Sequence, residues 1–201
     1  MSEFDRWETR FAAPGYVFGE APNAFLAAQK TRLPGRGRAL AVSDGEGRNG
    51  VWLAEQGLDV VSMDFSPSAQ AKALALAARR GVTITTELAD MDTYPWPEDT
   101  YDVVAAIFIQ FLGPPGRARA FAGMRRTLKT GGLLLMQGYT PAQLAHGTGG
   151  PKQLENLYTR ALLAAEFSDM AALTITDYEA DLQEGAGHRG FSAVIDLIAV
   201  K

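Results

Sequence analysis

Three glycines follow an apolar run at the spacing G-x-G-x-x-G, namely Gly45, Gly47 and Gly50 in LAVSDGEGRNG. Glycines in such a turn let the backbone approach a ligand closely and direct the first amides of the next helix at it. A tight turn that needs positive φ gives the same pattern, so the spacing alone is weak evidence. Asp64 strengthens the evidence for a nucleotide site. It ends the next apolar run, where a carboxylate can accept hydrogen bonds from both ribose hydroxyls of a nucleotide. The alternative for Asp64 is a charge at a helix N-terminus.

Two acidic residues, Asp44 and Glu46, flank the first glycine. Their carboxylates would repel a pyrophosphate but suit an ammonium and a sulfonium group. This favours S-adenosyl-L-methionine over a nicotinamide dinucleotide, whose dehydrogenases normally need a second substrate domain. The nicotinamide alternative stays open because the glycine spacing fits it literally.

Further contacts to this cofactor are expected after the neighbouring strands. Asp90 is placed to accept a hydrogen bond from an adenine amino group and Met91 to pack on the ring, although Asp90 and Asp92 also suit a solvated loop. Arg48 is a candidate for the methionine carboxylate, with a surface ion pair as the alternative. The residues expected to bind the cofactor are Asp44, Gly45, Glu46, Gly47, Arg48, Asn49, Asp64, Phe65, Ser66, Asp90, Met91 and Ile107.

Composition limits the remaining possibilities. A chain of 201 residues with 47% hydrophobic content suits one domain. A net charge of −4 argues against a nucleic-acid partner, and the absence of cysteine with only two histidines argues against a metal site. No stretch has the apolar length of a membrane span or a secretory signal, so we expect a cytoplasmic protein, a monomer or weak dimer, that does not bind membranes.

The elements that must position these residues alternate between strand and helix, as in a doubly wound α/β sheet. Residues 1–37 are expected to form an arm with one helix at 23–31, residues 38–140 a cofactor-binding half, and residues 141–201 a helix and an antiparallel hairpin. The predicted strands are 38–43, 58–63, 82–88, 101–108 and 133–139, with hairpin strands at 172–182 and 191–200. The predicted helices of these two parts are 49–56, 67–80, 116–130 and 154–167.

Five motifs together resemble a known family. They are Y-x-F-G-x-x-P-N (residues 16–23), GEGRN (45–49), V-x-x-x-D-x-S (60–66), K-T-G-G (129–132) and L-x-E-G-x-x-H-x-G (182–190). The chain resembles the class I S-adenosylmethionine-dependent methyltransferases, in particular the small tellurite-resistance and thiopurine-type group. The resemblance implies a Rossmann-like fold with helices on both faces of a mostly parallel sheet of order 3-2-1-4-5-7-6, in which strand 7 is antiparallel.

The resemblance also suggests candidate catalytic residues. The group has a His-Arg pair near its C-terminus, here His188 and Arg189, which implies that Arg189 clamps an anionic acceptor and His188 acts as a base or donor. A histidine that caps a glycine turn is the alternative. One departure is that Ala41 and Ser43 occupy positions where the family has an acid and a glycine, which leaves Asp44 to supply the charge.

The expected activity is methyl transfer to a small-molecule acceptor, possibly a soft thiol or a chalcogen oxyanion. Such in-line displacement depends mainly on close placement of the nucleophile in a dry site, so a catalytic base is optional. Gln110 and Phe111 are expected to shape the acceptor pocket, and Tyr16 and Phe18 either line a lid or pack the arm. A non-catalytic protein that binds the same ligand remains an alternative.

Overall fold

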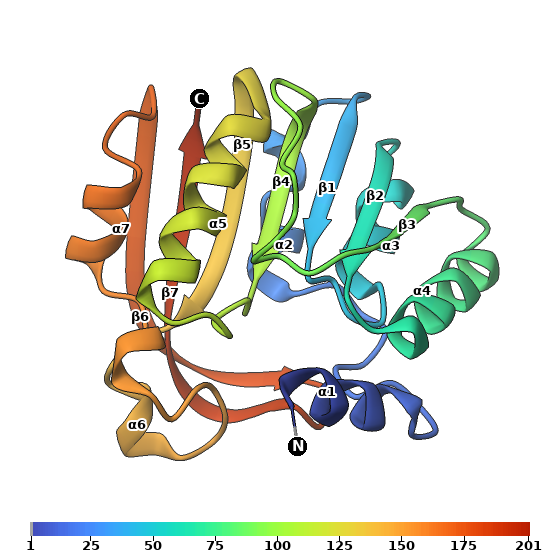
Figure 1. Cartoon of the computed structure of the whole chain (residues 1–201), viewed down its shortest axis with the longest axis horizontal. Helices are drawn as coiled ribbons and strands as arrows, with labels where there is room; N and C mark the ends of the chain where they lie inside the picture. The colour runs from blue at the N-terminus through green and yellow to red at the C-terminus, as the bar shows by residue number, and fades with distance from the viewer. Residues whose placement is uncertain (1) are drawn as a thin grey trace.

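The computed structural model describes residues 2–201, which form one seven-stranded sheet of order β3-β2-β1-β4-β5-β7-β6 (Figure 1). β7 pairs antiparallel with both β5 and β6, and the other pairs are parallel. The predicted strand order and the antiparallel strand are therefore confirmed. The strands are β1 (Arg38–Val42), β2 (Asp59–Asp64), β3 (Thr85–Leu88), β4 (Tyr101–Ile107), β5 (Leu128–Tyr139), β6 (Ala172–Glu184) and β7 (His188–Val200).

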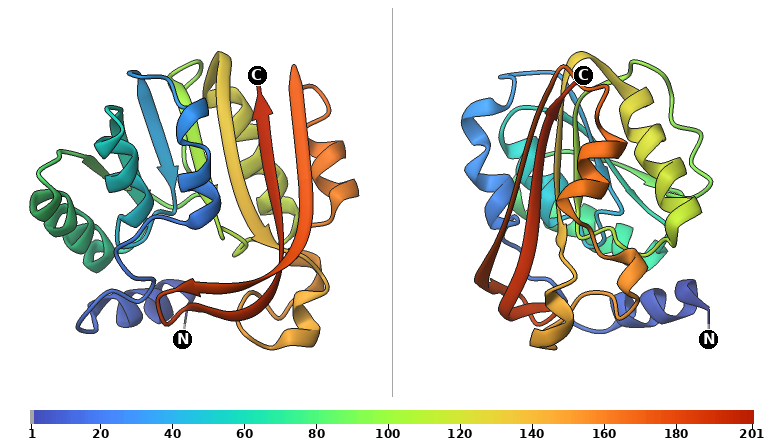
Figure 2. Two further views of the ribbon diagram at one scale, coloured as in Figure 1. Left: turned by 180° about the vertical axis from the view of Figure 1, so that it is seen from behind. Right: turned by 90° about the vertical axis from the view of Figure 1, so that its left-hand side faces the viewer.

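Helices cover both faces of the sheet and divide the core into two layers (Figure 2). One layer packs α2 (Ala24–Ala28), α3 (Arg48–Glu55) and α4 (Pro67–Arg80) on the sheet, and the other packs α5 (Pro114–Thr127) and α7 (Arg160–Glu166). Alternate residues of the central strands enter opposite layers, so these strands are apolar on both faces, as expected for a covered parallel sheet.

The sequence sets both ends of α4. The Ser66 hydroxyl accepts a hydrogen bond from the Ala69 amide, and Pro67 occupies the first turn. Gly81 ends the helix with a φ of +70°. This local chemistry fixes the chain direction directly after Asp64, the residue on which the predicted site depends.

The arm contains a helix that we did not predict. α1 (Glu3–Ala12) begins with a reciprocal capping box between Ser2 and Asp5, whereas the predicted helix at 23–31 shortens to α2 and a 3₁₀ turn at Lys30–Arg32. α1 is mostly charged, and its aromatic residues Phe4, Trp7 and Phe11 recur at helical spacing along one face. It lies beneath the lower edge of the sheet, at the carboxyl ends of the parallel strands (Figure 1).

The C-terminal hairpin is longer than predicted. Its strands continue to Glu184 and from His188, so the turn comprises only residues 185–187. The extended tip bends along the lower edge of the sheet toward α1 (Figure 1), and the amides of Ala186 and Gly187 donate hydrogen bonds to the Val17 carbonyl. The N-terminal arm and the tip of the C-terminal hairpin therefore meet at the carboxyl edge of the sheet.

The segment between β5 and β6 also differs from the prediction. The expected helix at 154–167 is split into a 3₁₀ turn at Leu154–Asn156 and α7, whose N-terminus is capped by the Thr159 hydroxyl. A short α6 (Gln143–His146) precedes it. Among residues 2–201, no helix is both long and apolar enough to cross a membrane.

Candidate active site

A cavity of about 750 Å³ lies at the carboxyl edge of β1, β2, β4 and β5. α1 and the tip of the β6–β7 hairpin contribute to its walls, together with residues 148–153 of the segment after β5. Open α/β sheets bind ligands at this edge. The site predicted from the glycine turn therefore coincides with a real cavity.

The glycines of the turn are required both by conformation and by space. Gly45 and Gly47 have φ values of +58° and +86°. A Cβ on Gly47 would lie 2.5 Å from the Ala73 Cβ of α4, and one on Gly50 would collide with the carboxylate of Asp44. The turn thus brings α3, α4 and a carboxylate into close contact beneath the cavity.

Asp44 is a buried carboxylate at the cavity wall. It accepts hydrogen bonds from the Ser62 hydroxyl (2.7 Å) and the Gly50 amide (3.1 Å). Within residues 2–201 it forms no ion pair. Burial raises its pKa to about 7, against the opposing effect of the two hydrogen bonds. The side chain therefore lacks a positive partner.

Asp64 also lines the cavity and is held by backbone amides. Its two oxygens accept hydrogen bonds from the Gly45 and Ser66 amides, each at 2.9 Å. Burial raises the pKa of this carboxyl, and the amide hydrogen bonds oppose the rise. Its neighbour Phe65 lines the same wall and meets the ring of Phe4 from α1 edge to face, with 5.8 Å between centroids.

Arg48, in the first turn of α3, lines the cavity and pairs with Glu184 at the hairpin end of β6. The Nη2–Oε2 distance is 2.7 Å, and the side chains are 7% and 9% exposed. The other terminal nitrogen of Arg48, Nη1, is buried without a hydrogen-bond partner among residues 2–201. Asn49 is also at the wall, where its side-chain oxygen accepts a hydrogen bond from the Asn23 amide.

Several predicted cofactor residues lie outside the cavity lining. Glu46 turns away from the cavity, pairs with Lys72 of α4 (2.8 Å) and accepts a hydrogen bond from the Val17 amide of the arm. The Ser66 hydroxyl caps α4 and donates to Glu8. Of the two acidic residues predicted beside Gly45, Glu46 is therefore already neutralised by Lys72.

The two residues expected at the adenine are also outside the lining. Asp90 is exposed and accepts a hydrogen bond from the Asp92 amide, whereas Met91 is buried in the core layer of α5. Ile107, at the end of β4, does line the cavity. The structure thus brings seven predicted cofactor residues together there: Asp44, Gly45, Arg48, Asn49, Asp64, Phe65 and Ile107.

His188 lies in an aromatic stack on the far wall. Its ring packs between Phe18 (4.5 Å between centroids) and Phe108 (4.2 Å), and its Nδ1 is 2.7 Å from the Tyr139 hydroxyl. Burial lowers the pKa of His188 to about 3, with Arg48 and Arg10 adding to the effect, so the imidazole is neutral. A neutral imidazole with this pKa is suited to hydrogen bonding and is too weakly basic to act as a general base.

The predicted His-Arg pair is not brought together at the cavity. Consecutive strand residues point to opposite faces, so the side chain of Arg189 is exposed and does not line the cavity that His188 lines. Gln110 does line the wall, and its amide bridges Tyr139 and Asn156. Tyr16 lies outside the lining and donates a hydrogen bond to the Lys72 carbonyl.

α1 supplies residues that the sequence analysis missed. Trp7 and Phe11 stack on each other (5.4 Å), and the Arg10 guanidinium lies 5.2 Å from the Trp7 ring and 5.1 Å from that of Phe18. Phe111, which follows β4, meets Trp7 edge to face at 5.3 Å. The S-x-x-D cap at Ser2 and the four-residue spacing of the two rings were available signals for this helix. No group of three or more potential metal ligands occurs within the described residues.

Comparisons with known proteins agree with this architecture. Residues 39–132 match a family described as methyltransferase domain. The matched residues run from β1 into β5 and include the glycine turn. The demethylmenaquinone methyltransferase of Renibacterium salmoninarum is 32% identical over 134 residues, which cover 66% of this chain and 51% of that protein. The chain therefore spans about half the length of this curated relative.

Two solved structures share the fold over the whole chain. Phosphoethanolamine N-methyltransferase 2 of Haemonchus contortus, solved in complex with S-adenosyl-L-methionine, has a TM-score of 0.74 at 16% identity, with 60% of that chain covered. TehB from Haemophilus influenzae has a TM-score of 0.69 at 17% identity, with 67% covered. These two matches show the fold alone. The class I methyltransferase activity and the narrower tellurite-resistance or thiopurine-type group stay predictions.

Proposed function

We propose that this chain is a methyltransferase that binds S-adenosyl-L-methionine in the cavity and transfers its methyl group to a small-molecule acceptor. One observation carries the proposal: a buried carboxylate that forms no ion pair among residues 2–201, Asp44, lies at the same wall as Arg48, whose Nη1 has no partner there. An ammonium and a carboxylate on one carbon, as in an amino acid, supply both missing partners. Because Nη1 of Arg48 is buried, its contact with the ligand carboxylate requires a small rotation of the guanidinium or a bridging water.

The other residues of this wall fit the nucleoside end of the ligand. Asp64 follows the second strand, the position from which a carboxylate accepts ribose hydroxyls, and Phe65 and Ile107 offer apolar surface. When bound, the cofactor supplies an electrophilic methyl group on a sulfonium. The carboxylates beside the turn suit this cationic ligand better than the pyrophosphate of a dinucleotide.

The remaining walls indicate what kind of acceptor is used. The aromatic rings of α1 and the His188 stack exclude water, and the His188 imidazole offers a hydrogen bond that orients the acceptor. Because this imidazole is a weak base, the acceptor must attack as a lone pair or preformed anion, as a thiolate does. The aromatic lining of this wall favours an organic thiol with an apolar body over a small oxyanion.

Calorimetric titration tests the cofactor. S-Adenosylhomocysteine should bind, 5′-methylthioadenosine, which lacks the amino acid, should bind at least tenfold more weakly, and NAD should not bind. Equal affinity for the two nucleosides, or tight binding of NAD, would contradict the proposal.

Methyl transfer is tested with radiolabelled donor and a panel of thiols, tellurite and selenite. Incorporation into an apolar thiol is the expected result. Tight cofactor binding without transfer to any acceptor would favour the alternative of a non-catalytic ligand-binding protein.

A further inference from the structure

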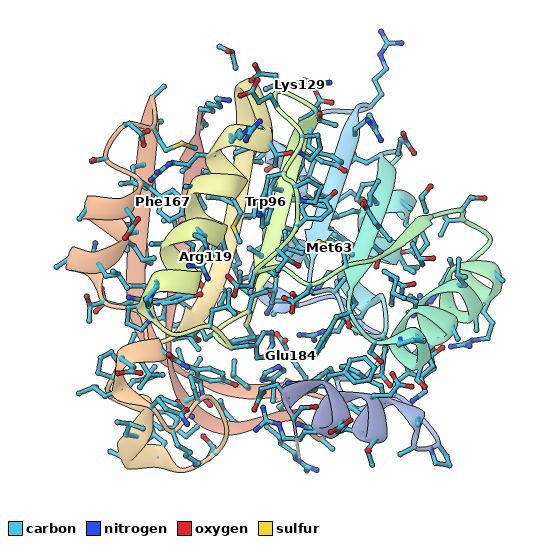
Figure 3. All side chains as sticks on the ribbon, in the orientation of Figure 1. Met63, Trp96, Arg119, Lys129, Phe167 and Glu184 are labelled. Carbon is cyan, nitrogen blue, oxygen red and sulfur yellow. The ribbon has the colours of Figure 1, made fainter. Side chains whose placement is uncertain are left out.

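We propose that Glu184 is a positioning residue, which holds Arg48 in the orientation that binds the carboxylate of the ligand. The inference rests on the proposed function and extends it to a residue of the C-terminal hairpin that does not itself line the cavity. Figure 3 shows Glu184 between the lower edge of the sheet and α1. It is 136 positions away from Arg48 in the sequence.

The contact of Glu184 with Arg48 is specific and enclosed. Oε2 of Glu184 lies 2.7 Å from Nη2 of Arg48, and both side chains are less than a tenth exposed. A guanidinium is a rigid planar fork with donors on separate edges. Glu184 binds one terminal nitrogen of this fork and leaves the other, Nη1, without a partner.

Glu184 is itself held by the N-terminal arm. Its carboxylate accepts hydrogen bonds from the Asn23 side-chain amide (3.0 and 3.1 Å) and from the Ala24 backbone amide (3.0 Å). Asn23 is fully buried, and its side-chain nitrogen also donates to Gln137 of β5 (2.7 Å). The carboxylate is therefore fixed by two donors besides the guanidinium, and these lie on the residues that precede and begin α2.

A second hydrogen bond joins the same arm to α3. The Asn23 backbone amide donates to the Asn49 side chain (2.9 Å), directly after Arg48 in the sequence. Asn23 thus contacts both the residue that holds Arg48 and the residue that follows it. Three of the sequence motifs, in the arm, the glycine turn and the hairpin, meet in this one network.

Stability alone is a poor explanation for this buried ion pair. Removing two charges from water is costly, and the attraction between them often no more than offsets the cost. A carboxylate that fixes one edge of a guanidinium, while the other edge lacks a partner beside a cavity, is instead typical of a preorganised anion site. Holding the side chain in place beforehand lowers the entropy lost when the ligand carboxylate binds.

The test compares two nucleosides on the full-length protein. Glu184→Gln keeps the size of the side chain and one acceptor, but removes the charge that holds Arg48. We expect its affinity for S-adenosylhomocysteine to fall at least fivefold, with that for 5′-methylthioadenosine unchanged, because only the first ligand has a carboxylate. The ratio of the affinity for S-adenosylhomocysteine to that for 5′-methylthioadenosine should therefore be at least fivefold lower in the variant than in the wild type.

Two further variants make the interpretation specific. Arg48→Lys keeps the charge but loses the fork, so it should lower the same ratio, and the double variant should be no worse than Arg48→Lys alone. Glu179→Gln, an exposed position on the same strand that pairs with His146, should leave the ratio unchanged. If Glu184→Gln does not unfold cooperatively, Glu184→Asp retracts the carboxylate by one methylene and should lower the ratio instead.

The outcomes separate the two proposals. Equal binding of both nucleosides by the wild-type protein would contradict the proposed function itself. A wild-type preference for S-adenosylhomocysteine that persists or grows in the Glu184 variants overturns the positioning role alone, as does an equal loss of affinity for both nucleosides, which indicates general damage to the fold.

Discussion

The two sides of the cavity are built in opposite ways. The side that we propose for the cofactor draws Asp44, Arg48 and Asp64 from one continuous stretch at the ends of β1 and β2, and its polar groups are charged side chains and backbone amides. The side that we propose for the acceptor gathers aromatic rings from α1, the arm, the residue after β4, β5 and the hairpin around His188. A local segment thus provides the electrostatic recognition, and distant segments provide the apolar enclosure.

Removal of Asp64 is the strongest test of the charged side. Asp64→Ala should weaken binding of S-adenosylhomocysteine by about 1.5–3 kcal/mol, or about 10- to 150-fold, because two charge-assisted hydrogen bonds to the ribose are lost. Calorimetry measures the loss, and Asp59→Ala, an exposed position on the same strand, is the control. Unchanged affinity would mean that the ribose does not lie at the end of β2.

The pH dependence of binding tests Asp44. Its pKa in the unliganded protein is about 7. Below this pH the Asp44 carboxyl must lose its proton before it can pair with the ammonium group of a ligand. Affinity for S-adenosylhomocysteine should rise by up to about tenfold per pH unit between pH 5 and 7 and level off above that. Asp44→Asn should flatten this curve, whereas 5′-methylthioadenosine should show no rise even in the wild-type protein.

The same raised pKa has an opposite effect on the unliganded fold. Because the folded pKa exceeds the unfolded value of 3.8, the contribution of Asp44 to stability is complete below about pH 4 and is lost as the pH rises through 7. Urea unfolding at pH 5 and pH 7.5 measures this contribution as the difference between wild type and Asp44→Asn. A wild-type protein that gains stability relative to the variant over this range would contradict the assignment.

His188 tests the apolar side. His188→Phe keeps a ring between Phe18 and Phe108 but loses the contact with Tyr139, and should lower kcat about tenfold with the Kd of S-adenosylhomocysteine unchanged. Since the imidazole is neutral at all working pH values, the wild-type kcat should show no ionisation near pH 6.5. A fall in cofactor affinity would instead assign His188 to the charged side.

The smallest effect is expected at Phe111. Phe111→Ala removes an aromatic pair with Trp7 at the cavity wall, worth about 0.5–1.5 kcal/mol, and should raise the acceptor KM about two- to tenfold without changing kcat. Phe191→Ala, an exposed ring outside the cavity lining, is the matched control. An unchanged KM would place the acceptor away from α1.

This difference between the sides explains what the sequence could predict. The charged turn follows from local spacing, and the strand order was implied by the family resemblance, so both could be predicted before the structure was known. Glu46 illustrates the limit, because Lys72 neutralises its carboxylate from a helix whose packing the sequence does not show. Arg189 was misplaced through the hairpin, since the strand continues past the expected loop and turns its side chain away.

The missed helix has a similar cause. α1 has one buried residue, Phe11, and is otherwise mostly charged, although Phe4, Trp7 and Phe11 recur at helical spacing. Its rings face a cavity rather than the sheet, so this spacing and the capping box were the local signals that marked it. The contact of these rings with the rest of the aromatic wall is made at long sequence separation, and no local pattern specifies it.

The placement of the chain ends has a practical consequence for anyone who produces this protein. The N-terminus lies beside α1 and the C-terminus at the opposite end of the sheet (Figure 1). A purification tag fused before Ser2 would therefore extend from α1, which contributes to the cavity wall, whereas one fused after Lys201 would begin at the other end of the sheet. Turnover numbers from the two kinds of fusion should not be pooled.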